Sequence, residues 1–301
     1  EVDVRVSVMP VVYGEKVALR LLDRAGLPRD KHQLGLSPAD LARFDDLLRR
    51  PHGIILVTGP TGSGKTTTLY VMLRELNDAT KNIVTLEDPV EYKLRGINQT
   101  QVHPRAGLTF AAGLRALLRQ DPDIIMVGEI RDPETAEIAV RAALTGHLVL
   151  STLHTNDAPS AVTRLADMGI PHFLISASLA GCIAQRLVRR ICKECAETYE
   201  ATPQEKEILG VPPEAALSLR RGRGCPWCLN TGYRGRTGIF EIMTVGEALR
   251  RAVDRRAGTD ELRDLARREG MTDLFASGRE KVLAGETTPA ELLRVTRGHP
   301  P

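Results

Sequence analysis

The sequence predicts an α/β fold in which a parallel β-sheet is buried on both faces. Two observations support this prediction. Short, continuous apolar runs indicate strands that are covered on both sides, and the helical segments between them fit right-handed crossovers of a parallel sheet. The apolar runs occupy residues 54–58, 83–86, 124–127 and 148–152, and the intervening helices are expected at 66–76, 109–119 and 134–144.

Polar residues follow each apolar run, at the point where each strand is expected to end. Loops at the carboxyl ends of parallel strands form the crevice in which such folds bind ligands. The pattern therefore predicts a RecA-like core over residues 51–185, with its ligand site along that edge of the sheet.

The segment before this core predicts a β-hairpin and a linker. Residues 2–8 and 17–22 are expected to form two strands around a turn at Gly14. We interpret residues 1–23 as the C-terminal remnant of a preceding domain, and we expect residues 24–50 to form a linker and one helix.

That helix is expected to begin at Pro38, with Ser37 as its N-cap, and to end near Pro51. After the core, residues 186–240 hold two pairs of cysteines, and residues 241–301 are rich in helix-forming residues and punctuated by glycine. The sequence thus predicts a cysteine module followed by a small C-terminal helical subdomain.

Composition and charge limit the classes of protein to which the chain can belong. Its 301 residues are 42% hydrophobic, which is enough for one large core or two moderate ones. The 41 Lys and Arg against 38 Asp and Glu give a formal net charge of +3, so nucleic acid is not the expected partner. No apolar run approaches the roughly 18–20 residues of a transmembrane helix, and we expect a cytoplasmic protein.

A phosphate-binding loop is predicted directly after the first apolar run. The pattern Gly59-x4-Gly64-Lys65-Thr66 has a strand before it and a helix after it, as the motif requires. Glycines let backbone N–H groups approach phosphate closely, and the helix N-terminus adds its dipole. Lys65 is expected to reach the β- and γ-phosphates of ATP, and Thr66 to hold Mg²⁺. The candidate nucleotide-binding residues are Gly59, Pro60, Thr61, Gly62, Ser63, Gly64, Lys65, Thr66 and Thr67.

Acidic residues and a histidine end the other apolar runs. The second run leads into Glu87, Asp88 and Glu91, of which one carboxylate is expected to orient the attacking water; a solvated turn begun by Asp88 is the alternative. Glu129 follows the third run, where a Walker-B acid coordinates Mg²⁺. His154 follows the fourth run, where it can sense a γ-phosphate or simply cap a strand.

Two Cys-x-x-Cys pairs, Cys192/Cys195 and Cys225/Cys228, predict a structural zinc site. Four thiolates at this spacing fit a closed tetrahedral Zn²⁺ site with no position open to substrate. A redox pair and buried free thiols are the alternatives. Nearby basic residues leave nucleic acid, anionic lipid or the cytoplasmic face of a membrane protein as possible contacts; they are Arg189, Arg190, Arg220, Arg221 and Arg223.

Four ordered sequence boxes resemble those of the type II and type IV secretion ATPase superfamily. They are GPTGSGKT at 59–66, TLEDPVE at 85–91, LRQDPDIIMVGEIR at 118–131 and TGHLVLSTLH at 145–154. The two cysteine pairs resemble the type II secretion and pilus-extension members more than the retraction members. The resemblance covers essentially the whole chain and implies that the preceding domain is PAS-like.

The resemblance also implies roles for four arginines. Arg5 and Arg20 match family arginines that reach the nucleotide from the preceding domain, and Arg115 and Arg119 match a second pair. The last two are four residues apart, so they share one helix face and can point at a γ-phosphate across a subunit or domain boundary.

The function implied is Mg²⁺-dependent ATP hydrolysis by a homo-hexameric motor beneath a bacterial inner membrane. The motor would power type II protein secretion through pseudopilus assembly, or type IV pilus extension. Its expected partners are an inner-membrane platform protein, a membrane recruiter with a cytoplasmic domain and acidic phospholipids. The alternatives are a nucleic-acid-stimulated RecA-like ATPase, a retraction or conjugation ATPase, and a nucleotide-gated scaffold.

Overall fold

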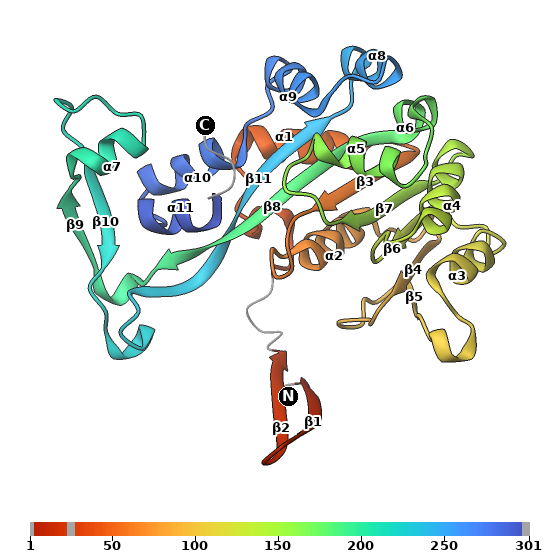
Figure 1. The fold of residues 1–301 in the computed structure, drawn as a ribbon, viewed down its shortest axis with the longest axis horizontal. Helices are drawn as coiled ribbons and strands as arrows, with labels where there is room; N and C mark the ends of the chain where they lie inside the picture. The colour runs from red at the N-terminus through yellow and green to blue at the C-terminus, as the bar shows by residue number, and fades with distance from the viewer. Residues whose placement is uncertain (1–2, 23–27, 297–301) are drawn as a thin grey trace.

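The computed structural model describes the backbone of residues 3–22 and 28–296 and contains the predicted sheet (Figure 1). Seven strands lie in the order β11-β8-β3-β7-β6-β4-β5, and only β11 runs antiparallel to its neighbour. Their bounds are β3 Gly53–Thr58, β4 Ile83–Glu87, β5 Asn98–Gln101, β6 Ile124–Val127, β7 Leu148–Leu153, β8 Leu179–Ile191 and β11 Tyr233–Thr244. The predicted α/β fold class is confirmed.

Both faces of the sheet are buried, which explains why the predicted strands are continuously apolar. In β3, Ile55 and Val57 pack with one hydrophobic cluster, whereas Ile54 and Leu56 pack with another on the opposite face. Helices α1 (Pro38–Leu48) and α2 (Lys65–Leu76) supply the first cluster. The second is supplied by α3 Phe110–Leu117, α4 Pro133–Leu144, α5 Ser160–Asp167, α6 His172–Ser178 and the C-terminal helices.

Helix capping fixes several of these boundaries. The Ser37 hydroxyl accepts a hydrogen bond from the backbone N–H of Asp40 at 3.1 Å, with Pro38 in the first turn, so α1 begins where the sequence predicts. It ends at Leu48, slightly before the expected end near Pro51. In the same way, the Asp132 carboxylate accepts from the N–H of Thr135 at 2.8 Å and starts α4.

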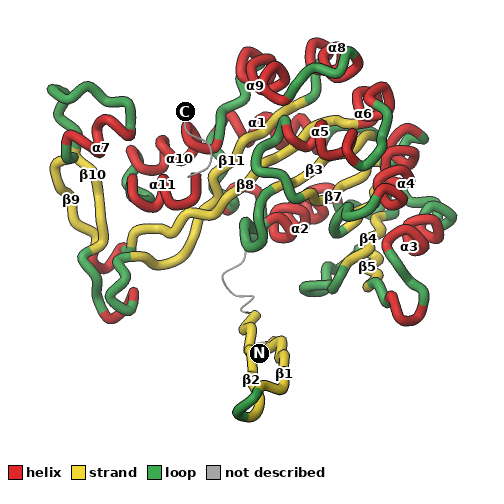
Figure 2. Tube along the Cα trace, in the orientation of Figure 1, coloured by secondary structure: helices red, strands yellow, loops and turns green. Residues whose placement is uncertain are grey.

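Strands β8 and β11 continue beyond the sheet as a long antiparallel ribbon that carries the cysteine module (Figure 2). The module also contains β9 (Ala196–Glu200), β10 (Ser218–Gly222) and α7 (Pro203–Ile208). The predicted boundaries at 185/186 and 240/241 therefore fall inside two continuous strands. Polar and basic residues in the outer half of β8 hide this strand from an analysis of apolar runs.

The C-terminal helices are α8 Glu247–Asp254, α9 Thr259–Arg268, α10 Leu274–Leu283 and α11 Pro289–Thr296. Of these, α10 packs against β8 and β11 and α11 packs against β8, whereas α8 packs against α6 and α9 packs against α8 and α5. Four short 3-10 helices complete the described elements: η1 Lys31–Gln33, η2 Pro104–Ala106, η3 Lys193–Cys195 and η4 Pro226–Cys228. None of the helices in residues 28–296 combines the length and apolar character needed to cross a bilayer.

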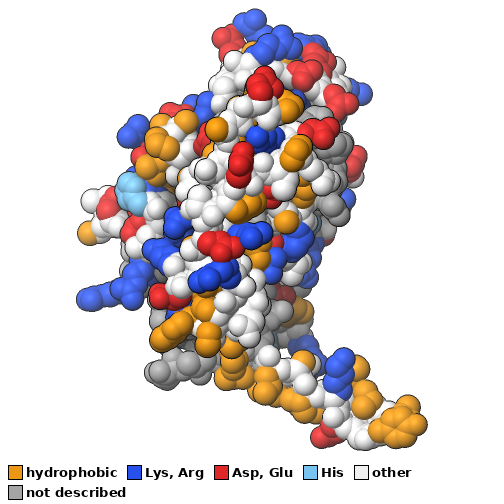
Figure 3. All heavy atoms as spheres, turned by 90° about the vertical axis from the view of Figure 1, so that its left-hand side faces the viewer, with side chains coloured by type: hydrophobic (Ala, Val, Ile, Leu, Met, Phe, Trp, Pro, Cys, Tyr) orange, Lys and Arg blue, Asp and Glu red, His pale blue; other side chains and the backbone are white. Residues whose placement is uncertain are grey.

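The N-terminal hairpin consists of β1 (Asp3–Val11) and β2 (Gly14–Leu22). The observed turn is formed by residues 12 and 13, and Gly14 opens the second strand. One face of the hairpin is apolar and exposed, as the hydrophobic side chains in Figure 3 show. Three cross-strand pairs form this face: Val4 with Leu21, Val6 with Leu19, and Val8 with Val17.

Candidate nucleotide site and metal centre

The predicted phosphate loop joins β3 to α2 and lines a cavity of about 710 Å³. Gly59, Gly62 and Gly64 have φ angles of 146°, 81° and 91°, values that side chains rarely allow. Residues 61–67 line the cavity. Gly59 and Pro60 lie behind them, where their carbonyl groups accept hydrogen bonds from the Lys65 ammonium at 2.8 and 3.2 Å.

The Lys65 ammonium is suited to an anionic ligand. Burial lowers the pKa of Lys65, Glu129 opposes this shift, and Arg186 adds to it. An anion in the cavity would offset the cost of burying this charge. The hydroxyl of Ser63 does not face the cavity: it is buried without a hydrogen-bond partner among the described residues and lies beside Gly59, on the side of the loop that meets Gln185. The loop therefore fits the phosphates of ATP through Lys65 and its backbone N–H groups.

Glu129 and His154 lie at the same cavity, at the ends of β6 and β7. The Glu129 carboxylate pairs with Arg131 and lies 3.5 Å from Nε2 of His154. Its side chain is 14% exposed, so it is shielded but remains open to the cavity. Oxygen ligands suit Mg²⁺, and the hydroxyl of Thr66 and this carboxylate are the candidate ligands.

Glu87 also lines the cavity, but it is 2% exposed and is held by three hydrogen bonds. Its carboxylate accepts from the hydroxyl of Tyr70, from the hydroxyl of Thr85 at 2.6 Å and from the side-chain amide of Gln99 at 3.1 Å. Burial and the bond to Glu87 raise the pKa of Tyr70, so its hydroxyl stays a donor. The orientation of Glu87 is therefore fixed.

The four predicted arginines do not line this cavity with described side chains. Arg115 pairs with Glu134 at 2.6 Å on the surface, and Arg119 donates to the carbonyl of Arg115 at 3.0 Å. Arg5 and Arg20 face each other across the hairpin by their backbones, and their side chains lie outside the described part of the chain. The roles of these four arginines at the nucleotide stay predictions.

The four cysteine sulfurs lie within 4.8 Å of one another. The sulfur–sulfur distances are 3.9 Å for Cys192–Cys225, 3.8 Å for Cys195–Cys228 and 3.7 Å for Cys225–Cys228. A tetrahedral site with metal–sulfur bonds of about 2.3 Å has edges of about 3.8 Å, and these three distances match it, so the cluster could hold Zn²⁺. Backbone N–H groups of Cys225 and Gly232 donate to the sulfur of Cys228 at 3.2 and 3.3 Å and favour its thiolate form.

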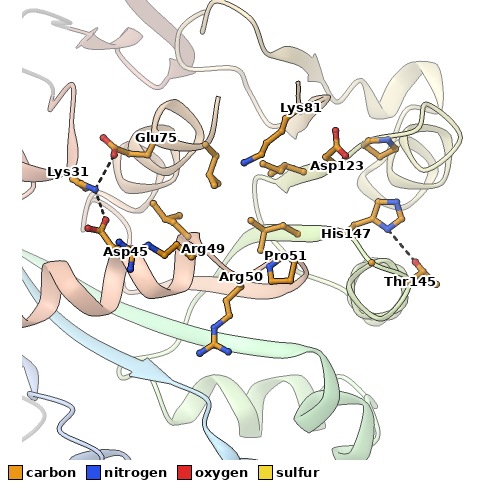
Figure 4. A pocket seen from close by; sticks show the side chains of 16 residues that line it. Lys31, Asp45, Arg49, Arg50, Pro51, Glu75, Lys81, Asp123, Thr145 and His147 are labelled. Atoms are coloured by element: carbon orange, nitrogen blue, oxygen red, sulfur yellow. Dashed lines mark hydrogen bonds and ion pairs between the residues drawn. The ribbon is translucent and has the colours of Figure 1, made fainter. Parts of the chain in front are cut away.

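A second cavity, of about 560 Å³, lies at the opposite edge of the sheet (Figure 4). Lys31 lies between Asp45 and Glu75 and contacts them at 2.6 and 3.3 Å, while His147 faces Thr145 at 3.3 Å. The carboxyl ends of α1, α2 and α4 meet here. Helix carboxyl ends carry partial negative charge, whereas the phosphate loop places a helix amino end at its cavity.

Several residues that lie behind the nucleotide site have no functional pattern in the sequence. Tyr70 lies in the apolar face of α2, and Gln99 lies in the short polar edge strand β5. Gln185 and Arg186 follow the apolar half of β8. The pattern that could have indicated Gln185 and Arg186 is an apolar strand followed directly by Gln-Arg.

A buried parallel sheet with a glycine-rich loop before α2, and acids at the neighbouring strand ends, defines a P-loop nucleotide-binding protein of the RecA-like type. The tetracysteine module is an additional feature, which only some proteins of that class contain. Residues 1–294 match the family model described as "Type II/IV secretion system protein", and the chain belongs to this family.

The chain is similar to curated type II secretion proteins. It is 56% identical over 297 residues to "Type II secretion system protein E" of Pseudomonas aeruginosa and 54% identical over 296 residues to "Type II secretion system ATPase E" of Vibrio cholerae. These matches cover 99% and 98% of this chain but 59% of each relative. The chain therefore spans about three fifths of the length of these relatives.

Solved structures support the same fold. The pilus retraction motor PilT with bound ADP is 31% identical, has a TM-score of 0.71, and the match covers 97% of this chain and 73% of that chain. The Legionella pneumophila ATPase DotB, at 23% identity, also has a TM-score of 0.71, with 99% and 73% covered. The second match bears on the fold alone.

Proposed function

We propose that the protein hydrolyses ATP with Mg²⁺ and powers type II protein secretion by driving pseudopilus assembly. The observation that supports this most strongly is one cavity that joins the phosphate loop to Glu129 and His154, in a chain of the type II/IV secretion family. Mg²⁺ would neutralise charge that develops on the transferred phosphoryl group. The remaining chemistry depends on the protein's own side chains.

Each side chain has a proposed role. Lys65 and the loop amides bind the phosphates, and Thr66 and Glu129 hold the cation. Glu87, whose orientation is fixed by its three donors, orients the attacking water. His154 lies beside Glu129 and senses the γ-phosphate. A Glu87→Gln variant that hydrolyses ATP at the normal rate would remove Glu87 from this scheme.

Completion of the site needs a second body. The exposed apolar face of the hairpin supports its packing against a further domain, because contiguous exposed apolar surface marks an interaction site. We assign residues 1–23 to that preceding domain and propose that Arg5 and Arg20 reach the nucleotide with it. Arg115 and Arg119 act across a subunit boundary of a homo-hexamer.

The proposed location is the cytoplasmic face of the bacterial inner membrane. There, hydrolysis would move the preceding domain against the core, and the ring would pass this motion to an inner-membrane platform protein. A membrane recruiter with a cytoplasmic domain would hold the motor in place, and acidic phospholipids would contact its basic surface.

One experiment separates this function from the nucleic-acid motor. ATPase activity is measured with vesicles of acidic phospholipid and, separately, with single-stranded DNA. Stimulation by vesicles alone supports the membrane motor, and stimulation by DNA alone supports the alternative. In a secretion assay, a Glu129→Gln variant that binds ATP yet fails to secrete excludes a nucleotide-gated scaffold, which would tolerate the loss of hydrolysis.

Type IV pilus extension is the second candidate, and the tetracysteine site supports it equally. Deletion of the gene, followed by assays for a secreted enzyme and for surface pili, decides between the two. We expect loss of secretion with pili retained; the opposite pattern assigns the protein to pilus extension.

A further inference from the structure

Gln185 lies directly behind the phosphate loop. Thr58, the last residue of β3, pairs with Ala184 of β8, so the next residue of β8 stands beside the start of the loop. Its side chain is 2% exposed and does not line the nucleotide cavity. The amide therefore faces the rear of the loop rather than the ligand.

The side-chain amide of Gln185 connects the end of the phosphate loop to the start of helix α2. Its Nε2 donates to the backbone carbonyl of Ser63 at 2.8 Å, and its Oε1 accepts from the hydroxyl of Thr68 at 2.6 Å. A buried amide offers both a donor and an acceptor in fixed geometry. Here one side chain holds the end of the loop and the first turns of α2 together.

The bond to Ser63 fixes the direction of a peptide group. In a trans peptide, the carbonyl and the N–H point in opposite directions. Because the carbonyl of Ser63 points back to Gln185, the N–H of Gly64 points forward, on the side where residues 61–67 line the cavity. A peptide turned the other way would present a carbonyl oxygen to a phosphate.

The close approach of β8 also explains two of the loop glycines. A Cβ atom at Gly64 would lie 2.7 Å from Nε2 of Gln185, and one at Gly59 would lie 2.5 Å from its backbone oxygen. Both are closer than Cβ contacts in proteins allow. These glycines therefore make room for Gln185 on one side of the loop as well as for phosphate on the other.

We propose that Gln185 is a positioning residue for nucleotide binding: its amide sets the orientation of the Ser63–Gly64 peptide that faces the phosphates. This inference rests on the proposed phosphate site. It differs from a purely structural role, in which the amide only satisfies its own buried polar atoms. A positioning role changes nucleotide affinity, whereas a structural role changes only the stability of the fold.

The test compares three variants by titration with fluorescent mant-ADP and Mg²⁺, together with thermal unfolding without nucleotide. Gln185→Leu removes both hydrogen bonds at similar volume, and we expect Kd to rise about tenfold. Thr68→Val removes one support of the amide, and we expect a rise of about threefold. Ser178→Ala is the matched control: it removes a buried hydroxyl bond of 2.6 Å to the carbonyl of Leu174, just before β8, and leaves Kd unchanged.

The outcomes separate the alternatives. In the variants that weaken binding, KM for ATP should rise with kcat changed by less than about threefold. Nucleotide affinity equal to wild type in Gln185→Leu, or an equal rise in Ser178→Ala, overturns the inference. If Gln185→Leu does not fold, an unchanged Kd in Thr68→Val overturns it. If Lys65→Ala binds mant-ADP as tightly as wild type, the phosphate site itself is wrong, whatever Gln185 does.

Discussion

The phosphate loop and the cysteine cluster both lie against strand β8. They differ in how many of their expected functional side chains lie together within this one chain. The cysteine cluster has all four ligands within 4.8 Å, at separations that already suit the metal. The phosphate loop has its lysine, its acids and its histidine in one cavity, but the side chains of Arg115 and Arg119 do not line it. The first site is closed, as structural metal sites are. For the second, we propose that a partner completes the site.

Lys65→Ala should break the nucleotide site and leave the cysteine site intact. We expect ATPase activity to fall by at least about 100-fold, because the variant loses the positive charge that would stabilise the phosphates in the transition state. Zinc content, measured by plasma mass spectrometry, should stay at one ion per chain. Lys81→Ala, at the second cavity, is the control and should keep normal activity; equal losses in both variants would contradict the assignment of the two cavities.

Cys228→Ser should give the converse result. Structural zinc sites depend on all four ligands, so we expect loss of bound zinc and loss of amide hydrogen-exchange protection across residues 192–232. Affinity for mant-ADP should change by less than about threefold, because no cysteine lines the nucleotide cavity. Cys182→Ala, which changes a buried cysteine outside the cluster, should keep its zinc. Zinc retained in Cys228→Ser would refute the four-cysteine site.

Glu291→Ala should destabilise the base of the cysteine module. The buried carboxylate binds Arg189 of β8 at 2.8 Å and Arg294 of α11 at 2.7 Å. Because both arginines are about half exposed, its removal leaves no buried charge, and we expect the loss of these hydrogen bonds to cost about 1–3 kcal/mol. Glu197→Gln, which weakens an exposed pair with Arg221, should cost less than about 1 kcal/mol. Urea unfolding measures the loss of stability in both variants. Equal losses would contradict the expected difference between the buried and the exposed carboxylate.

The pH dependence of this cluster follows from its pKa. Burial alone would raise the pKa of Glu291, but hydrogen bonds from Arg294 and Arg189 lower it to about 2. A depressed acid pKa stabilises the fold above its unfolded value of 4.5. This contribution should be lost as the pH falls from 4.5 towards 2, and a stability profile that is flat over this range in wild type would contradict the assignment.

Glu241, in the part of β11 that lies in the core, should have the opposite effect on the pH dependence of stability from Glu291. It accepts a hydrogen bond from the N–H of Ala158 at 2.7 Å, close to the loop that carries His154. Burial raises its pKa to about 7 from 4.5; Asp157 and Asp273 add to the shift, and Arg263 opposes it. The folded state therefore holds a proton that the unfolded state releases, and this contribution is lost as the pH rises from 4.5 to 7.

The Glu241→Gln variant tests this prediction. We compare the free energy of unfolding of the variant with that of wild type by urea unfolding at pH 5 and at pH 8. The difference in favour of the variant should be larger at pH 8 than at pH 5, by up to about 3 kcal/mol. An equal difference from wild type at both pH values would contradict the raised pKa.

Part of this comparison could be predicted from the sequence. The four apolar runs predict the centre of the sheet because a strand buried on both faces must be apolar throughout. The polar edge strand β5 has no such constraint and could not be found in this way. The cysteine site is equally readable, since Cys-x-x-Cys spacing already implies a metal. The hydrogen bonds that support the phosphate loop could not be predicted from the sequence.

Those supports come from residues far apart in the chain. Tyr70 holds Glu87 across 17 residues and Gln185 holds Ser63 across 122, and no local pattern links either pair. The roles of Arg5, Arg20, Arg115 and Arg119 came only from the family resemblance, and they stay predictions. If a second body completes the site, as we propose, the local sequence holds only part of its signature.

The most direct test of the difference between the two sites is ATPase activity per subunit, measured against protein concentration, with sedimentation and zinc content followed in parallel. If the nucleotide site is completed by a second subunit, specific activity should rise with concentration as the protein assembles, while zinc stays at one ion per chain throughout. Specific activity that is constant down to concentrations at which sedimentation shows only monomers would contradict this account.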